Sequence, residues 1–494
     1  MKNTIFILCL ILLFSSCTNV YYIDSDLGDD SNSGISPAKA WASLEKVNQT
    51  IFQPGDKILF KSGTAYFGQL EPKGSGIEGK LILIDRYGKG KKPVIHGNGE
   101  QLYTLLLHNV EYWEIRNLEI TNAGKERIAN RRGVIISAEN FGDCHHIVID
   151  SLEIHHVNGS LVKKDGGGSA ILWKNSGEKI PTRFVDLIMQ NNYIYECSRN
   201  GINSKGNTNR NKWFPSTGVI IRNNVLENIP GDGIVPIGCD GAIIENNILR
   251  NFPDILSHEE AAAGIWPWSS DNTLIQYNEV SGHKAKWDGQ GFDSDYNCIG
   301  TIIQYNYSHN NYGGFLLICN NGFSYKNSGN IGTKNTTIRH NISINDGIRP
   351  YPTKRKGDFS PIFHITGPTE NTYIHNNVII LTEQTLDNSI VKMDNWGNLW
   401  PVSTLFENNI FFIKVPSAFL FADDIGTKFY NNNYYGDINN LPEDLNAVFS
   451  EPNFINEKAR GSGFGILKNF MLKKEDSLLN LNIGISNKIL DNRN

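Results

Sequence analysis

Three aspartates stand close together in the most polar stretch of this chain. Asp288, Asp293 and Asp295 fall within eight residues, inside the segment Trp287–Asn297. In an extended strand, side chains 293 and 295 point to the same face and lie about 6.5–7 Å apart. Crowded carboxylates repel one another, so the cluster suits either a bound cation or an acid that must stay protonated. We therefore expect acid–base catalysis here, and a structural calcium site or a solvated turn stays open as an alternative.

Further carboxylates precede this cluster. Glu260 follows His258 and Glu259, and Asp232 stands in a Gly-Asp-Gly turn. The chain is expected to form coils about 4.8 Å apart. A carboxylate one coil away from the cluster then matches the gap of roughly 5–5.5 Å between the two carboxyl groups of a retaining glycosidase. A carboxylate that is two coils away matches the gap of roughly 6.5–9.5 Å in an inverting glycosidase. We expect Asp293 and Asp295 to act as nucleophile or base, with Glu260 or Asp288 as the acid.

Aromatic and histidine side chains accompany the acids. Indole rings offer apolar faces and a polar N–H to a sugar, and histidine exchanges protons near neutral pH. His309 is therefore a candidate acid or base, and His283 a candidate contact to the substrate. The candidate sugar platforms lie in or beside insertions: Trp213, Trp266, Trp268 and Trp287. The basic run Lys354–Lys356 is interpreted as a solvated loop.

A repeated phrase indicates the scaffold that must position these groups. It reads IIRNNVL at Ile220–Leu226 and IIENNIL at Ile243–Leu249, and it returns to LFENNIF at Leu405–Phe411. The second Asn, or its equivalent, recurs every 23 to 36 residues at Asn192, Asn224, Asn247, Asn278, Asn306, Asn341, Asn377, Asn409 and Asn432. Each copy has the alternation and the flanking turn residues of a short strand.

The shortest steps fit one bare coil, and the longer ones fit a coil with an inserted loop. A propeller blade needs about 40 residues and is too long. A parallel β-helix fits better, because Asn inside a coil corner can hydrogen-bond to the Asn of the next coil and tolerates left-handed backbone. The Asn-rich turns of a β-sandwich are the alternative.

Composition narrows the class of protein. The chain has 494 residues, 39% of them hydrophobic, and a formal net charge of −5. That length permits a large core, and the solvated outer face of a solenoid accounts for the low apolar fraction. With a pI near 6.2 and no basic block, the chain is not expected to bind nucleic acid.

The N-terminus predicts export. Lys2 precedes an apolar run from Ile5 to Phe14, and Ser15-Ser16-Cys17 follows. The run is too short for a membrane-spanning helix and is typical of a signal sequence. Small residues before Cys17 resemble a bacterial lipoprotein box, in which Cys17 carries the lipid that ties the protein to a membrane surface. A plain secretory signal is the alternative.

Five cysteines remain after the signal segment. Their spacing matches no zinc motif, and an odd number argues against a full disulfide framework. We expect Cys298 and Cys319, which lie about one coil apart, to pack as small buried hydrophobic side chains rather than form a bridge. The full set is Cys144, Cys197, Cys239, Cys298 and Cys319.

The predicted organisation has four parts. Residues 1–17 form the signal peptide and 18–52 an N-terminal strand with a capping helix, opened by Ser36-Pro37. Residues 53–436 form the β-helix, and 437–494 a C-terminal cap or tail. Solenoids need such atypical terminal units.

Several segments resemble secreted right-handed parallel β-helix carbohydrate-active proteins of Bacteroidetes. The likeness lies in Tyr21–Asp24, Gly28–Gly34 and Ser36–Trp41, and extends to Ala263–Ser269 and Asp288–Phe315. It implies a right-handed, pectin-lyase-like fold. For activity it implies either hydrolysis or elimination, because such proteins include glycoside hydrolases and polysaccharide lyases.

Two families sharpen this choice. Pectate lyases of family 9 place a Lys base after Gly-x-Gly-Phe, but here Leu316 follows Gly313-Gly314-Phe315; Lys286 or Lys326 would have to substitute. Xylosidases of family 120 follow an Asp nucleophile with a Glu one coil later. Asp295 resembles that nucleophile, but Cys319 and its neighbours replace the Glu, so the acid must come from Glu260 or Asp288.

We therefore predict a single-stranded right-handed parallel β-helix that acts as a glycoside hydrolase on a complex polysaccharide. It is expected to be a monomeric lipoprotein of the periplasm or outer membrane, without an assigned metal or cofactor. A calcium-assisted polysaccharide lyase and a non-catalytic glycan-binding lipoprotein are the alternatives.

Overall fold

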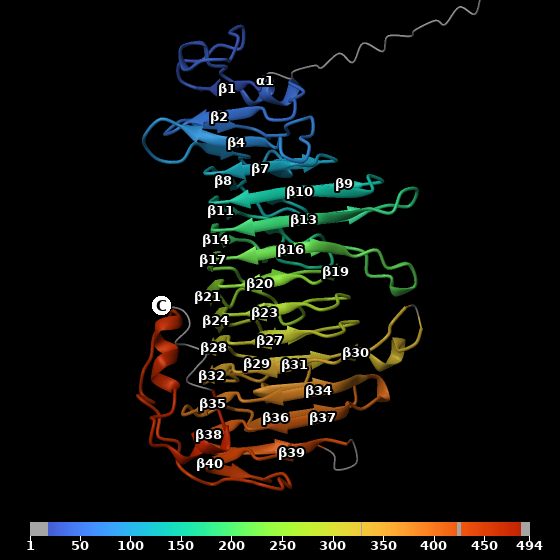
Figure 1. Cartoon of the computed structure of the whole chain (residues 1–494), viewed down its shortest axis with the longest axis vertical. Coiled ribbons are helices and arrows are strands. Elements are labelled where there is room, and N and C mark those ends of the chain that lie inside the picture. The colour runs from blue at the N-terminus through green and yellow to red at the C-terminus, as the bar shows by residue number, and fades with distance from the viewer. Residues whose placement is uncertain (1–17, 328, 422–425, 486–494) are drawn as a thin grey trace, which may run out of the picture.

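The structure is a stack of coils wound around one long axis. It is a computed structural model that describes residues 18–327, 329–421 and 426–485. Figure 1 shows the strands of successive coils one above another, from the N-terminal cap to the last coil. Strands of neighbouring coils pair in parallel. The predicted parallel β-helix is confirmed.

One sheet runs the length of the stack, with one strand from each coil (Figure 1). Its strands are β1 (Val20–Ile23), β2 (Lys57–Lys61), β4 (Ile82–Tyr87), β7 (Trp113–Arg116), β10 (Asp143–Asp150), β13 (Arg183–Gln190), β16 (Ser216–Arg222), β20 (Ile243–Glu245), β23 (Leu274–Gln276), β27 (Ile302–Gln304), β31 (Thr337–Arg339), β34 (Thr369–His375), β37 (Val402–Glu407) and β39 (Lys428–Tyr430). Two short strands extend it at the edge, β19 (Cys239–Asp240) and β30 (Thr333–Lys334).

The second sheet follows the first around a corner of each coil. Its strands are β3 (Ala65–Phe67), β5 (Val94–His96), β8 (Glu119–Asn122), β11 (Glu153–Val157), β14 (Tyr193–Cys197), β17 (Val225–Glu227), β21 (Ile248–Phe252), β24 (Glu279–His283), β28 (Tyr307–His309), β32 (Ile342–Ile344), β35 (Val378–Leu381), β38 (Ile410–Leu420) and β40 (Asn433–Asn439).

The third side closes each coil and carries the insertions. Its upper strands are β6 (Tyr103–His108), β9 (Arg132–Glu139), β12 (Ser169–Ser176), β15 (Asn200–Lys205) and β18 (Ile234–Val235). Single bridges through Ile265 link β18 to the lower strands. These are β26 (Gln290–Ser294), β29 (Gly314–Cys319), β33 (Phe363–Thr366) and β36 (Ser389–Asp394).

Apolar residues fill the interior of the coils in register. In the first sheet Ile221, Ile244, Ile275 and Ile303 are opposite one another in successive strands, and all are fully buried. The residues on either side of Ile244 and Ile275 are only partly buried, which is the period of two expected of a strand with one face in the core. Every coil thus adds a layer to one continuous core.

The repeated Asn forms a ladder at the corner between the first two sheets. The side-chain oxygen of Asn247 accepts from the backbone N–H of Asn224 at 3.0 Å and from its Nδ2 at 2.9 Å, and Asn247 makes the same two bonds to Asn278. The pattern continues coil by coil to Asn432, where Asp444 accepts the last bonds. The preceding corner residue, such as Asn223, has a positive φ. The predicted role of the Asn pair is confirmed.

The N-terminal cap differs from the single helix expected after Ser36. Pro37–Lys39 form one turn of 3-10 helix, and α1 (Leu44–Gln49) begins separately. Between them Trp41 is extended and bridges to Ile23. The carboxylate of Asp30 accepts from the N–H groups of Ala42 and Ser43 and holds this break open.

The segment after β40 packs along the side of the stack. Figure 1 shows it running back beside the strands of the second sheet, up to about β28. It covers outward-facing apolar residues such as Ile344, Ile380 and Phe412 with Phe454 and Leu467. Within the described residues, the helices are too short or too polar to cross a bilayer. The five cysteines that the structure describes are free and buried, so Cys298 and Cys319 form no bridge, as expected.

Candidate active site

A cavity of about 640 Å³ opens on the outer side of the third sheet. Its floor is formed by β26, β29, β33 and β36, and one wall by the short pair β22 (Ala261–Ala262) and β25 (Trp287–Asp288). The chemically active side chains that line it are Lys163, Asp232, Trp266, Trp287, Asp288, Asp293, Asp295, Tyr296, Cys319, Arg349, Arg355, Lys356, His364, Asp394 and Trp396. Asp288, Asp293 and Asp295 are thus brought together.

Strand alternation explains why these acids face the cavity. In β26, Ser294 pairs in register with Ile318 and Ile365, which are core residues of the next two coils. Asp293 is one position away and pairs with Leu317, which lines the cavity. Because side chains alternate along a strand, Asp293 and Asp295 share the outward face. The predicted common face is confirmed.

Asp293 is the most enclosed of the three acids. Its side chain is almost fully buried, and among the described residues its Oδ1 has no hydrogen-bond partner. Burial, followed by the charges of Asp295 and Asp288, raises the pKa of Asp293 well above its ordinary value. Asp293 therefore holds its proton more tightly than an ordinary aspartate does.

Asp295 is better placed to be ionised. Burial raises its pKa, but hydrogen bonds to the carboxylate act in the opposite direction. The N–H of Tyr296 donates to its Oδ1 at 2.6 Å, and Sγ of Cys319 donates to the same oxygen at 3.1 Å. The cluster therefore accommodates its negative charge most easily on Asp295.

Asp288 has the properties of a general acid. Burial and then the charge of Asp295 raise its pKa to about 7, although Lys163 and Arg349 lower it. A group with a pKa near the working pH can both give and take a proton. The backbone of Asp288 is left-handed, with φ +59°, and its carbonyl accepts from Arg349.

The structure does not bring Glu260 into the cavity. Its carboxylate lies 3.0 Å from the guanidinium of Arg199, which is fully buried, and accepts from the backbone N–H of Lys163 at 2.8 Å. Because Glu260 is held by Arg199 and does not line the cavity, Asp288 is the better placed acid. Glu260 instead fixes the loop that carries Lys163.

Lys163 and Asp232 form the upper wall. The Lys163 Nζ lies 3.4 Å from Oδ2 of Asp232 and 4.8 Å from the centre of the Trp266 ring. The indole N–H of Trp266 donates to Oδ1 of Asp232 at 3.2 Å. Lys163 precedes Asp288 by more than 100 residues. The sequence therefore did not predict that the two residues line the same cavity.

Two of the four predicted tryptophans line the cavity, Trp266 and Trp287. Trp287 stacks near Phe359, with the Arg355 guanidinium 4.9 Å above its ring. Trp268 does not line the cavity and packs instead against the cluster that contains Trp266, with its ring centre 6.0 Å from that of Tyr296.

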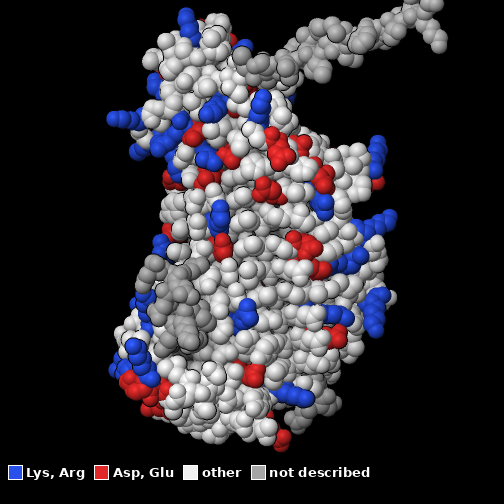
Figure 2. Space-filling view, in the orientation of Figure 1, with Lys and Arg blue, Asp and Glu red and all other residues white. Residues whose placement is uncertain are grey.

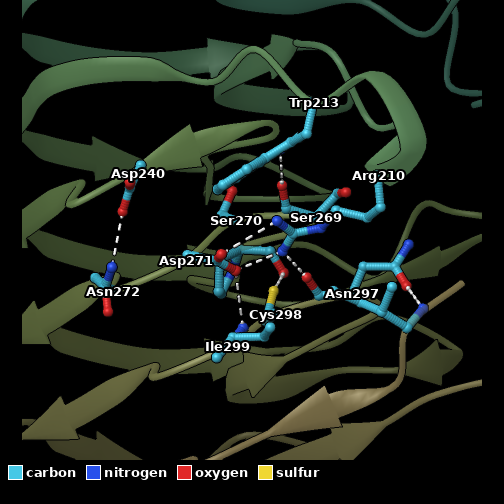
Figure 3. A network of polar contacts seen from close by, with 12 residues as sticks. Arg210, Trp213, Asp240, Ser269, Ser270, Asp271, Asn272, Asn297, Cys298 and Ile299 are labelled. Atoms are coloured by element: carbon cyan, nitrogen blue, oxygen red, sulfur yellow. Dashed lines mark hydrogen bonds and ion pairs between the residues drawn. The ribbon is translucent and has the colours of Figure 1, made fainter. Parts of the chain in front are cut away.

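Trp213 fastens an insertion rather than lining the cavity. Figure 3 shows it beside Arg210, whose guanidinium lies 3.9 Å from the ring centre and pairs with Asp271. The indole N–H of Trp213 donates to the carbonyl of Ser269 at 3.2 Å. Its contacts are those of a packed loop anchor.

Both predicted histidines lie outside the cavity. His283 is fully buried, stacks on Phe252 and bonds the carbonyl of Gly231 at 3.0 Å; its burial lowers its pKa to about 4. His309 belongs to the second sheet and lies 3.3 Å from Glu279, beneath the C-terminal segment. Neither reaches the acids, because both stand on strands of the second sheet, outside the cavity.

The residues at the far end of the cavity were not predicted from the sequence. Asp394 ends β36, where Lys356 bonds it at 2.7 Å and His364 lies 3.4 Å away. Trp396 follows and is 41% exposed, with its ring 5.5 Å from that of Tyr296. Arg355 and Lys356, interpreted above as solvated, also line this end. Asp394 is reached by following the strand pairing from Asp295, coil by coil, to the end of β36. This register would have pointed to Asp394.

The donor atoms do not suit calcium. The carboxylates of Asp293 and Asp295 and the sulfur of Cys319 offer atoms that all lie within 4.8 Å of one another. Calcium prefers six to eight oxygen ligands, and a thiol is a soft donor. The calcium alternative therefore has little support from this geometry.

Comparisons with known proteins agree with this architecture. A family model described as "Right handed beta helix region" matches residues 169–379. The chain is 28% identical to a lacto-N-biosidase of Bifidobacterium longum subsp. longum, over 88% of its own length and 32% of that relative. It thus spans about a third of the length of this curated relative.

A solved structure shares the fold. The crystal structure of a GH136 lacto-N-biosidase from Eubacterium ramulus matches with a TM-score of 0.63 and 24% identity. The match covers 86% of this chain and 68% of that one. The chain is a right-handed parallel β-helix.

Proposed function

We propose that the chain is a glycoside hydrolase in which Asp295 is the nucleophile and Asp288 the general acid. The observation that carries the proposal is the pairing of these two groups in one cavity: an acid with a pKa of about 7 beside a carboxylate stabilised by two donors. Environments that give two neighbouring carboxyl groups different pKa values divide the roles of acid and nucleophile between them. The kinship with lacto-N-biosidases supports the same class of reaction.

The proposed mechanism retains anomeric configuration. Asp295 attacks the anomeric carbon while Asp288 gives its proton to the leaving oxygen. Asp288 then takes a proton from water, which attacks the same carbon and releases Asp295. The charge of Asp295 is the second cause of the high pKa of Asp288, so the two carboxyl groups interact within the one cavity that both line.

The cavity favours a short oligosaccharide over a long polymer. Its volume of about 640 Å³ falls within the roughly 300–1,000 Å³ of small-ligand sites. Trp287 and Trp396 would contact the sugar faces, and Asp394 with its partner Lys356 would bond hydroxyl groups. Glycans that carry lacto-N-biose are the first substrates to test, because the similar enzymes are named for that unit.

Product analysis tests the proposal. We expect wild-type protein to release a product that has gained one water, and Asp288→Asn and Asp295→Asn to lower kcat about 10²–10⁴-fold. A substrate with a nitrophenol leaving group should rescue Asp288→Asn only, because that group departs without a proton. Asp240→Asn is the matched control, since Asp240 bonds Asn272 away from the cavity. Full turnover by both variants would refute the assignment.

The same measurement separates the alternative functions. Lys163, Arg355 and Lys356 in the cavity are the observation that favours a lyase on an acidic sugar. However, each of them is paired with a carboxylate. An unsaturated product without added water would identify the lyase, and binding without new reducing ends a glycan-binding protein.

We also propose that the protein is exported and lipid-anchored at Cys17, a residue outside the described ranges. The support is the apolar run and the Ser15-Ser16-Cys17 motif. Incorporation of a labelled fatty acid, lost in Cys17→Ser, would test the anchor.

A monomer that does not bind nucleic acid is the expected form. On the face shown in Figure 2, acidic and basic side chains of the described residues are interspersed. Light scattering and a DNA-binding titration would check both expectations.

A further inference from the structure

The carboxylates of Asp293 and Asp295 and the thiol of Cys319 converge on one point of the cavity floor. Asp293 belongs to β26, Asp295 follows it, and Cys319 ends β29 in the next coil. Their donor atoms lie within 4.8 Å of one another. We propose that these three side chains form a binding site for a thiophilic divalent cation, Zn²⁺ or Cd²⁺, and that the bound ion inhibits the enzyme.

An unpartnered buried oxygen is the second observation that points to a ligand. Asp293 is 4% exposed, and its Oδ1 has no hydrogen-bond partner within the described part of the chain. A buried polar atom without a partner costs about 1–3 kcal/mol. A cation between Asp293 and Asp295 would satisfy that oxygen and turn the repulsion between two carboxylates into attraction.

The donor set selects the kind of ion. Zinc takes four ligands, with bonds of about 2.0–2.2 Å to carboxylate oxygen and about 2.3 Å to sulfur, so its ligand atoms stand about 3.3–3.7 Å apart. Sγ of Cys319 and Oδ1 of Asp295 are already 3.1 Å apart. Asp293 needs only a small movement, and water from the cavity supplies the fourth ligand.

Cys319 supplies the soft donor atom of the site, because a thiolate sulfur suits zinc and cadmium better than calcium. A bound dication displaces the thiol proton, as metal binding at cysteine generally does. Binding should therefore release protons.

Inhibition rests on the proposed function, whereas binding does not. An ion held by Asp295 would occupy the carboxylate that attacks the sugar. Hydrolysis should then fall in proportion to the occupied fraction of the site, and a chelator should restore it.

Calorimetric titration of the chelator-treated full-length protein with CdCl₂ tests the site. We expect one ion per chain, proton release, and a thiolate-to-cadmium absorption band in the ultraviolet. Cys319→Ala should weaken binding about 100-fold or more and abolish the band. Cys298→Ala is the matched control, because Cys298 is also free and buried but bonds the carbonyl of Pro267 outside the cavity. Asp293→Asn is a second variant, which keeps the size of the side chain and removes its charge.

Each outcome is informative. Equal cadmium binding by wild type and Cys319→Ala, or no binding at millimolar cadmium, would overturn the proposal. Binding that depends on Cys319 in a protein without hydrolase activity would uphold the site and reject the proposed function. Full hydrolysis by the cadmium-saturated protein would reject the inhibitory role.

Discussion

The guanidinium of Arg349 donates a 2.6 Å hydrogen bond to the backbone carbonyl of Asp288. A second bond of 2.6 Å joins it to the carbonyl of Ala285, so Arg349 spans residues 285–288, which include β25. Asp288 is a non-glycine residue with φ +59°, a conformation that persists only where its surroundings enforce it. A loop 61 residues downstream thus holds the backbone of the proposed general acid in place.

Replacement of Arg349 by Met should lower kcat about 10–100-fold with little change in KM, because the carboxyl of Asp288 loses its fixed position. Removal of the positive charge also raises the pKa of Asp288, so the alkaline limb of the pH–rate profile should move to higher pH. Steady-state kinetics between pH 5 and 9 would measure both effects.

Arg349→Lys is the companion variant, since it keeps the charge but cannot bridge both carbonyls. It should lose kcat and leave the alkaline limb near its wild-type position. If Arg349→Met has wild-type kcat while remaining folded, Arg349 does not position the acid.

The repeat made the scaffold predictable from the sequence. The positions of the inserted loops could not be predicted in the same way. The Asn phrase has a physical reason to recur in every coil, so it reports the register of β16, β20 and their successors. Strand alternation likewise placed Asp293 and Asp295 on one face. The loops that carry Lys163 and Arg349 have no such period, and their contacts are between residues far apart in sequence. Trp213 lies beside such an insertion and was misplaced for the same reason. His309 was misplaced although it stands on β28 of the repeat, because its residue type does not show that the second sheet lies outside the cavity.

Truncation of one ladder residue should destabilise the whole stack. Asn247→Ala removes the acceptor for two donors of Asn224 and leaves Oδ1 of Asn278 without the Nδ2 bond. These groups are buried, so we expect a loss of about 2–5 kcal/mol in the free energy of unfolding, measured in guanidinium. Asn223→Ala is the control: it occupies the exposed left-handed corner position and should cost only about 1–2 kcal/mol. Equal losses would show that the ladder adds nothing beyond corner conformation.

Lys163 should set the pH range of activity. Its charge lowers the pKa of Asp288, Asp293 and Asp295. Lys163→Met therefore raises the pKa of both acid and nucleophile, and the whole pH–rate profile should move upward by about half a pH unit, since Lys163 is partly solvated.

Lys286→Met supplies the control for that shift. Lys286 pairs with Asp254 and lies outside the cavity lining, so its loss should leave the profile in place. An unchanged profile in Lys163→Met would show that water screens its charge from the acids. Added salt should reduce the difference between wild type and Lys163→Met.

Asp288 should make the folded state less stable as the pH rises. Its pKa is about 7 in the folded chain and about 3.9 when unfolded, so the folded state binds the extra proton between these values. Stability associated with this group is therefore greatest below about pH 4 and is lost progressively up to about pH 7. Asp288→Asn removes this loss, and Asn accepts the left-handed backbone of position 288 without strain.

The variant should thus be more stable than wild type at pH 8, by about 1–4 kcal/mol, because a tenfold change in an acid dissociation constant corresponds to about 1.4 kcal/mol and cavity water screens part of it. The difference should shrink toward pH 4. Chemical unfolding of both proteins at pH 4.5, 6 and 8 would measure it. A constant offset at all three values would mean that Asp288 titrates normally in the folded chain, and the general acid would then have to be sought elsewhere in the cavity.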